Sequence, residues 1–276
     1  LAYAAELANK RGLPLLVYEG LTCTYDWAND RMHTFILEGV PDTAARLKEM
    51  GAGYVFHPRR RVADRNNAVY ELAKRAAAVV TDDYPTFIAR RHNERVPAKL
   101  DCAYFVVDSS CVVPMSLSEK REYAAYTIRP KITRLLPKYL QPFPKVELTK
   151  RWKLDAGAEW HVEVKREEIA ALVASCEIDH TVKPSLAFRG GAVEAERRLD
   201  FFLRKNLARY AEDRNEPSAQ ATSNMSPYLH FGHISSLEVA LRARDHALEQ
   251  GGKADEFLEE LIVRRELAFN YARWVE

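Results

Sequence analysis

The chain has 276 residues, 47% of them hydrophobic, which is enough for one large domain or two ordinary domains with buried cores. Its 41 basic and 39 acidic residues leave a net charge of only +2, so composition alone gives no argument for nucleic-acid binding. The four cysteines form no C-x-x-C pair, which argues against a disulfide framework or a zinc site. No apolar stretch reaches membrane-spanning length, and the N-terminus lacks the pattern of a signal peptide. A soluble, cytoplasmic protein with free thiols is expected.

The first hundred or so residues alternate short apolar runs with periodic helical segments. Strands are expected at 15–18, 54–57, 78–81 and 104–107, and helices around 30–50, 64–76 and 86–97. Alternation at this spacing is typical of βαβ units and predicts a mainly parallel sheet. The chain opens with Leu1 inside an amphipathic helical pattern that leads straight into a strand. We therefore expect the first strand of the sheet to be missing.

Residues 130–160 change in character. Four prolines are expected to break any long helix there: Pro130, Pro137, Pro142 and Pro144. We interpret this segment as a long connector across the surface of two domains. From about Glu167 the pattern is helical almost without interruption. One apolar stripe in it comprises Leu199, Phe202, Leu203, Leu207 and Tyr210. The predicted organisation is an α/β domain at 1–128, a linker at 129–165 and an all-α domain at 166–276.

The segment from Tyr210 to Ser236 contains two predicted helix starts. Ser226 followed by Pro227 is typical of an N-cap with proline at the first helical position, and Gly232 ends that short helix. Ser235 and Glu238 form a predicted capping box for the next helix. Hydroxyl groups and backbone N–H groups at such a helix start suit a pyrophosphate. A well-capped loop between two helices explains the same residues.

Charged residues in the last third of the chain allow two explanations. Glu260 and Arg264 are four residues apart in a strongly helical pattern at 257–274, which predicts an exposed ion pair. A basic stripe on the predicted helix that leads to Tyr210 comprises Arg198, Lys205 and Arg209. Such a stripe can hold DNA phosphates, or it can be an ordinary solvated helix face.

The sequence TSNMSPYLHFGHIS, which starts at Thr222, resembles the flavin-phosphate loop of the photolyase and cryptochrome family. A tyrosine stands twelve residues ahead of this threonine in the family, and Tyr210 matches it. The resemblance implies contacts to FAD from Tyr210, Thr222, Ser223, Asn224, Met225 and Ser226, with Met225 in place of the usual leucine. His230 and His233 resemble a metal pair only superficially, and no metal site is expected.

The sequence EELIVRREL, which starts at Glu259, is similar to a signature of class II photolyases. The resemblance implies that Glu260 is the catalytic residue that contacts the pyrimidine dimer, with an alignment uncertain by one position because Glu259 is adjacent. It also places Arg214, Arg264 and Arg265 at the DNA. The segments AAAVVTDDY, CAYFVVDSSCVVPM and EYAAYTIRPKI look like the same class. Residues 108–115 depart from the D-x-H-N-x-V-P pattern of many members.

The resemblance to class II cyclobutane-pyrimidine-dimer photolyases implies an α/β N-terminal domain of the antenna type with a Rossmann-like parallel sheet. An all-α FAD-binding domain, incomplete at its C-terminus, would follow. The implied function is light-dependent repair of UV-damaged DNA by electron transfer from photoexcited reduced FAD, carried out by a monomer. A deazaflavin or another antenna chromophore is a further candidate cofactor.

Two other functions stay open, a cryptochrome-like blue-light photoreceptor and a non-catalytic nucleotide-binding module. Members of the family extend well past the segment EELIVRREL. The 276 residues by themselves are therefore expected to bind FAD poorly and to be inactive in isolation.

Overall fold

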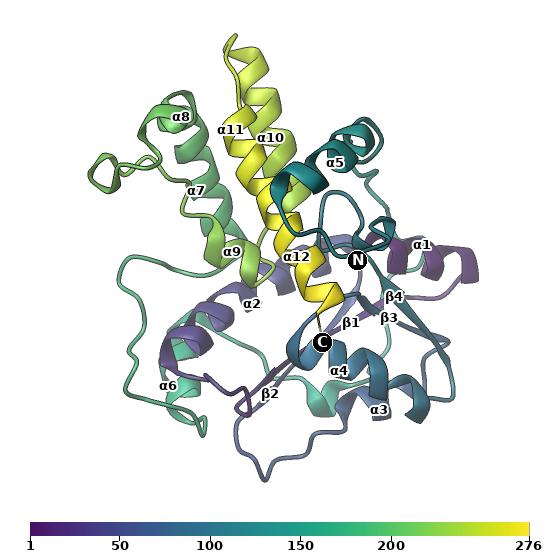
Figure 1. The fold of residues 1–276 in the computed structure, drawn as a ribbon. Coiled ribbons are helices and arrows are strands. Elements are labelled where there is room, and N and C mark those ends of the chain that lie inside the picture. The colour runs from purple at the N-terminus through teal and green to yellow at the C-terminus, as the bar shows by residue number, and fades with distance from the viewer. Residues whose placement is uncertain (276) are drawn as a thin grey trace. The chain divides into compact units, whose positions relative to one another are not determined.

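The structure, a computed structural model, describes residues 1–275 and divides into two compact units. The first unit comprises residues 1–78, 100–102 and 145–195, and the second comprises 79–99, 103–144 and 196 onward. Each unit therefore combines segments that are far apart in the sequence (Figure 1). The boundaries at residues 128 and 165 stay a prediction.

The first unit is built around two parallel strands, β1 (Leu16–Thr22) and β2 (Gly53–Arg59). Their register runs from Leu16 opposite Gly53 to Thr22 opposite Arg59. A long helix connects them, as parallel strands require. Its cap Asn29 accepts a hydrogen bond from the N–H of Met32. The helices of this unit are α1 (Ala2–Arg11), α2 (Asp30–Met50), α3 (Ala68–Ala73) and α6 (Ile169–Ala174).

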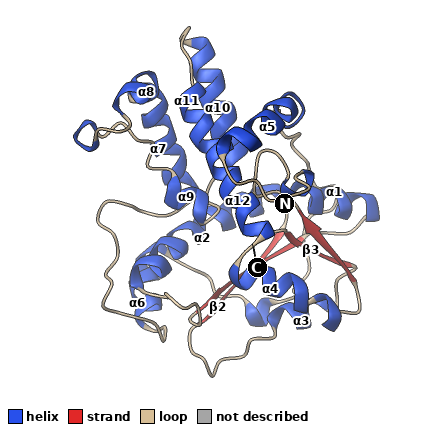
Figure 2. Cartoon of the chain, viewed as in Figure 1, coloured by secondary structure: helices blue, strands red, loops and turns tan. Residues whose placement is uncertain are grey.

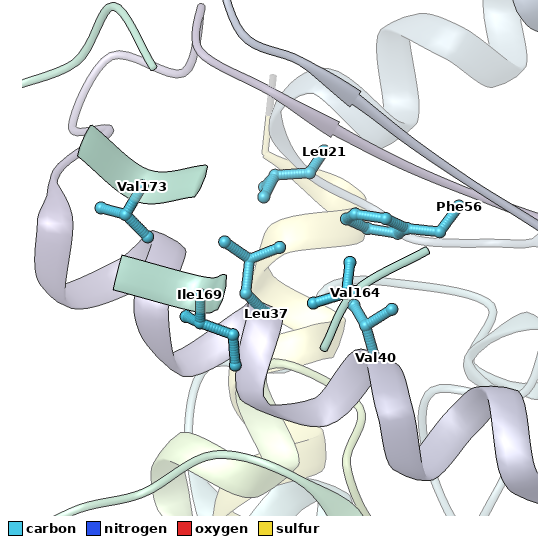
Figure 3. Close-up of a cluster of buried hydrophobic side chains, with 7 residues drawn as sticks. All are labelled: Leu21, Leu37, Val40, Phe56, Val164, Ile169 and Val173. Atoms are coloured by element: carbon cyan, nitrogen blue, oxygen red, sulfur yellow. The ribbon is translucent and has the colours of Figure 1, made fainter. Parts of the chain in front are cut away.

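The core of the first unit lies between these strands and helices α2 and α6 (Figure 3). Seven buried apolar side chains make up the cluster: Leu21, Leu37, Val40, Phe56, Val164, Ile169 and Val173. Leu21 and Phe56 come from the strands, while Leu37 and Val40 come from one face of α2. Burial of these side chains explains why the apolar runs of the sequence become strands and why α2 is amphipathic.

The connector predicted at 130–160 is not confined to the surface. Trp160 is only 4% exposed and Val164 only 9% exposed, and both pack in the first unit. The N–H of Val162 donates to the carbonyl of Phe56 at 2.9 Å, and the N–H of Phe56 donates to Nδ1 of His161 at 3.1 Å. The interpretation as a surface connector was therefore wrong for this stretch, because it runs along β2 and completes the core.

The second unit contains the strand pair β3 (Ala78–Asp82) and β4 (Ala103–Val107), with most residues in helices (Figure 2). All four predicted strands are confirmed. The helices of this unit are α4 (Phe87–Arg95), α5 (Ala125–Tyr139), α7 (Ala192–Lys205, from residue 196 on), α8 (Tyr210–Asp213), α9 (Ser226–His230), α10 (Ser236–Glu249), α11 (Asp255–Leu258) and α12 (Arg265–Trp274). The predicted stripe is confirmed for Leu199, Phe202, Leu203 and Leu207, which are buried, whereas its last member, Tyr210, is half-buried.

Helix α5 runs through two of the prolines that were expected to break it, Pro130 and Pro137. Both prolines are exposed, and they lie seven residues apart on one face of the helix. Each removes the hydrogen bond to the carbonyl four residues earlier, at Tyr126 and Thr133, and both of these residues are also exposed. Water can satisfy those carbonyls, so the helix continues to Tyr139.

The C-terminal half is less continuously helical than predicted, because residues 175–191 contain no helix. Ser226 is the first residue of α9 and not its cap, whereas Ser235 caps α10 and accepts a hydrogen bond from the N–H of Leu237. Gly232 follows α9 with φ of 70°, as expected for a residue that ends a helix. Across residues 1–275, no helix combines the length and apolarity that a membrane crossing needs.

Candidate functional site

A π-helical turn, Glu259–Arg264, interrupts the helix that runs from Asp255 to Trp274. The helix was predicted, but this interruption was not. In a π-helix each backbone hydrogen bond joins residues that are five positions apart. Such turns are rare overall, but those that occur often lie at functional sites. The turn contains Glu259, Glu260 and Arg264, so its geometry decides where these charges lie.

Glu259 is held by two arginines. Arg129 of α5 approaches it with both ends of its guanidinium, Nη2 at 2.7 Å from Oε1 and Nε at 3.1 Å from Oε2. Nε of Arg264 lies 3.5 Å from Oε1. The hydrogen bond from Arg129 is the main cause that lowers the pKa of Glu259, so this carboxylate stays ionised.

Glu260 has a different partner. Nη1 of Arg214 donates to its Oε1 at 2.6 Å, from a residue 46 positions earlier in the chain. The predicted pair between Glu260 and Arg264 was wrong, because the π-helical turn brings Arg264 to Glu259 five residues away. The Glu260 side chain keeps 39% of its surface exposed, compared with 25% for Glu259.

Tyr210 lies beside the same ion pair. The guanidinium carbon of Arg214 is 5.9 Å from the centre of the Tyr210 ring, and that ring packs edge-on against Phe202 and Phe257. Burial raises the pKa of the Tyr210 hydroxyl. The hydrogen bond to Glu260 raises the pKa of Arg214, which therefore remains a cation. The structure thus brings together Tyr210, Arg214 and Glu260, three residues to which the resemblance gave separate roles at FAD, DNA and the pyrimidine dimer.

The loop from Thr222 to Ser226 presents polar groups at the surface. Thr222, Asn224 and Ser226 are exposed, Ser223 is half-buried, and Met225 is only 1% exposed. Asn224 has φ of 54°, a left-handed conformation that asparagine tolerates better than most residues. The buried Met225 side chain anchors the loop, so any contact from this residue to a ligand would have to come from its backbone.

The segment just before this loop is fixed to the end of α7. Nδ2 of Asn206 donates to the carbonyl of Gln220 at 3.1 Å, and Nη2 of Arg209 donates to the carbonyl of Ala219 at 2.9 Å. Arg209 also pairs with Asp213 at 3.0 Å. These bonds give Arg209 a structural role, which neither explanation of the predicted basic stripe included.

The two other arginines expected at DNA differ in their surroundings. The Arg264 side chain is 54% exposed, and its contact with Glu259 is the long one described above. Arg265 donates from Nη1 to the carbonyl of Ser110 at 2.8 Å, and its guanidinium carbon lies 4.5 Å from the centre of the Phe269 ring. Arg264 is therefore the more accessible of the two.

Glu266 follows these arginines and is buried, with 5% of its surface exposed. Its Oε1 accepts hydrogen bonds from the N–H groups of Val112 at 2.8 Å and Val113 at 3.1 Å. Burial raises the pKa of this carboxyl to about 7, although both hydrogen bonds act in the opposite direction. Glu266 thus ties α12 to residues 108–115, the stretch that departs from the class II pattern.

Sequence reasoning did not single out Arg129 and Asn270. Oδ1 of Asn270 accepts a hydrogen bond from the N–H of Glu122 at 2.7 Å, and the Glu122 side chain pairs with Lys131. Arg129, Glu122 and Lys131 all belong to the segment EYAAYTIRPKI. The sequence therefore did indicate that this segment matters, since it resembles class II members. Nothing in the spacing of its residues indicated a partner in the helix at 257–274.

Comparison with known proteins shows the family of the chain. The chain matches the DNA photolyase family over residues 1–147. It belongs to this family. It is 36% identical over 280 residues to the deoxyribodipyrimidine photo-lyase of Methanothermobacter thermautotrophicus, covering 99% of this chain and 58% of that protein. It is 33% identical over 282 residues to the deoxyribodipyrimidine photo-lyase of Arabidopsis thaliana, covering 98% of this chain and 55% of that protein.

Solved structures show the same fold. A class III photolyase from Agrobacterium tumefaciens superposes with a TM-score of 0.69 at 18% identity, covering 99% of this chain and 56% of that one. A cryptochrome from Synechocystis superposes with a TM-score of 0.72 at 16% identity, covering 98% and 58%. The photolyase fold is thus confirmed, with an α/β part followed by a helical part. The chain spans under three fifths of the length of these relatives.

No group of three or more His, Cys, Asp or Glu side chains that could hold a metal ion occurs among the residues the structure describes.

Proposed function

We propose that this protein repairs UV-damaged DNA as a class II photolyase, splitting cyclobutane pyrimidine dimers under blue light. The observation that carries the proposal is the cluster of Tyr210, Arg214 and Glu260, in which an accessible carboxylate lies next to a cation. Relatives named deoxyribodipyrimidine photo-lyase match almost the whole chain, which supports the same activity.

The exposed loop fits the phosphates of FAD by its chemistry. Thr222, Ser223 and Ser226 supply hydroxyl groups, and Asn224 supplies an amide, all within five residues. Their hydrogen-bonding groups suit an anionic phosphate. Tyr210 and these four residues would hold the cofactor, and the buried side chain of Met225 would anchor the loop. When bound, FAD supplies the light-driven electron transfer, and the protein supplies binding and orientation.

The roles of the charged residues follow from their positions. A dimer flipped out of the duplex presents carbonyl and N–H groups, and Glu260 is the acid that would hydrogen-bond to them. Arg214 and the exposed Arg264 would contact phosphates of the damaged strand. Arg265 would contribute less to phosphate binding, because its guanidinium already donates to the carbonyl of Ser110. Their contacts would weaken as salt rises, because bound phosphates release counterions.

The decisive experiment measures dimer splitting by the full-length protein under blue light, with Glu260→Gln as the test variant. We expect the variant to keep its flavin and to lose about tenfold or more in repair, since a hydrogen bond to a charged group contributes about 1.5–3 kcal/mol. Glu256→Gln, an exposed acid in α11, is the matched control and should repair normally.

Two results would replace the proposal. A full-length protein that binds FAD but leaves dimers intact would be a cryptochrome-like photoreceptor. A full-length protein without flavin would be a non-catalytic nucleotide-binding module. An antenna chromophore such as a deazaflavin belongs to the same proposal, and an absorption band additional to that of FAD would identify it.

A further inference from the structure

Two neighbouring carboxylates in the π-helical turn have different surroundings. Glu259 has a two-pronged contact with Arg129 and a longer contact with Arg264, and 25% of its side chain is exposed. Glu260 has one contact, with Arg214, and 39% of its side chain is exposed. The two acids have the same side-chain chemistry, so their directions on the turn and their partners decide which of them remains available.

Each carboxylate has its own cation. Nη1 of Arg214 donates to Glu260 at 2.6 Å. The planar guanidinium of Arg129 meets Glu259 at two points, which fixes the orientation of this carboxylate. The hydrogen bond from Arg129 is the main cause that lowers the pKa of Glu259, and the charge of Arg214 adds less.

The π-helical turn adds a second constraint. It places Arg264 next to Glu259 and not next to Glu260, so a second cation is kept away from Glu260. Between them, Arg129 and Arg264 hold Glu259 on the side of α5, and Glu260 is left facing Arg214 and Tyr210. The arrangement also distinguishes the two acids that the alignment of the sequence left interchangeable.

We propose that Arg129 is a positioning residue for repair: it holds Glu259 so that Glu260 alone presents its carboxylate to the pyrimidine dimer. This inference rests on the proposed function, because it assigns a role to Arg129 at the same site. Arg129 binds Glu259 and not Glu260, so its effect would pass through the orientation of the turn.

The test uses the full-length protein with Arg129→Gln, Arg129→Lys and a matched control, Arg134→Gln, which changes an exposed arginine of the same helix. Repair yield per absorbed photon is measured at saturating dimer-containing DNA, together with the Kd for that DNA, the flavin absorbance and the melting temperature. We expect Arg129→Gln to lower the repair yield about tenfold, because small misplacements of a catalytic group cost rate. DNA affinity, flavin content and melting should stay close to wild type.

Two further arms separate positioning from mere stability. Arg129→Lys keeps one charged donor but not the two-point match, so it should regain only part of the yield. Glu259→Gln added to Arg129→Gln should lower the yield less than twofold further, since both changes remove the same contact. Arg134→Gln should repair normally.

The inference is overturned if Arg129→Gln repairs as well as an active wild-type protein. It is also overturned if repair falls only in step with flavin content and melting temperature in both Arg129 variants. A wild-type protein that binds flavin and splits no dimers overturns the proposed function itself and this inference with it, so the two failures are distinguishable.

Discussion

The loop at 222–226 and the helix at 257–274 both resemble photolyase signatures, but they are built in opposite ways. The loop turns its polar side chains outward and buries only Met225. The helix uses its charged side chains internally, in bonds from Glu259 to Arg129, from Glu260 to Arg214 and from Glu266 to the backbone at 112–113. Changes in the loop should therefore alter binding, whereas most changes in the helix should alter stability first.

The largest effect is expected where the helix supports Tyr210. Phe257 is 5% exposed and packs against Phe202 with ring centres 4.7 Å apart. Phe257→Ala should lower the free energy of unfolding by about 3–5 kcal/mol, the usual cost of emptying an aromatic core position. Urea unfolding measures this change. Tyr271→Ala, at a residue 55% exposed in α12, is the control and should cost far less; similar costs at both positions would contradict the distinction.

The next largest effect concerns the buried Glu266. Its pKa is raised from 4.5 to about 7 in the folded protein, so the folded state binds the proton more tightly than the unfolded state. The contribution of Glu266 to stability should be fully present below pH 4.5, fall by roughly 3 kcal/mol as pH rises to about 7, and then level off. Glu266→Gln, which keeps an acceptor for the two N–H groups, should flatten this part of the profile. Unfolding followed from pH 4 to pH 8 checks it, and an unchanged slope would remove Glu266 as its cause.

The smallest effect on stability is expected in the loop. Ser226→Ala should change the free energy of unfolding by less than about 0.5 kcal/mol, because this side chain is exposed. In the full-length protein it should weaken FAD binding about fivefold, the value of one hydrogen bond. Flavin titration measures the affinity. Ser235→Ala provides the reverse case: loss of the α10 cap should cost about 1 kcal/mol and leave FAD affinity unchanged.

Local patterns predicted the elements well, because each depends on neighbours in the sequence. The four strands, the long helix α2 and the stripe of α7 are examples. The π-helical turn could not be predicted, since EELIVR has an ordinary helical composition and the charged partners of the turn come from α5 and from Arg214, far away in the sequence. The pair of Arg214 and Glu260 joins residues 46 positions apart, and no spacing rule reaches that far. The resemblance named both residues but did not indicate that they touch.

The two prolines of α5 show the opposite failure: here a local rule, that proline breaks a helix, was applied too strictly. Pro130 and Pro137 do remove hydrogen bonds, but at exposed positions, where water can reach the carbonyl groups left without a donor. A rule that considers the side of the helix as well as the residue type would have predicted α5.

The core of the first unit constrains how the chain can fold during synthesis. Leu21 and Phe56 leave the ribosome early, but the apolar surface they offer is closed by Trp160, Val164, Ile169 and Val173. The apolar face of the first strands therefore stays uncovered until more than a hundred further residues have been synthesised. Contacts between segments so far apart in the sequence form slowly. During that interval they expose an unpaired edge and an apolar face to other chains. A nascent chain stalled before residue 160 should thus be a better client for chaperones than one released a few turns of helix later.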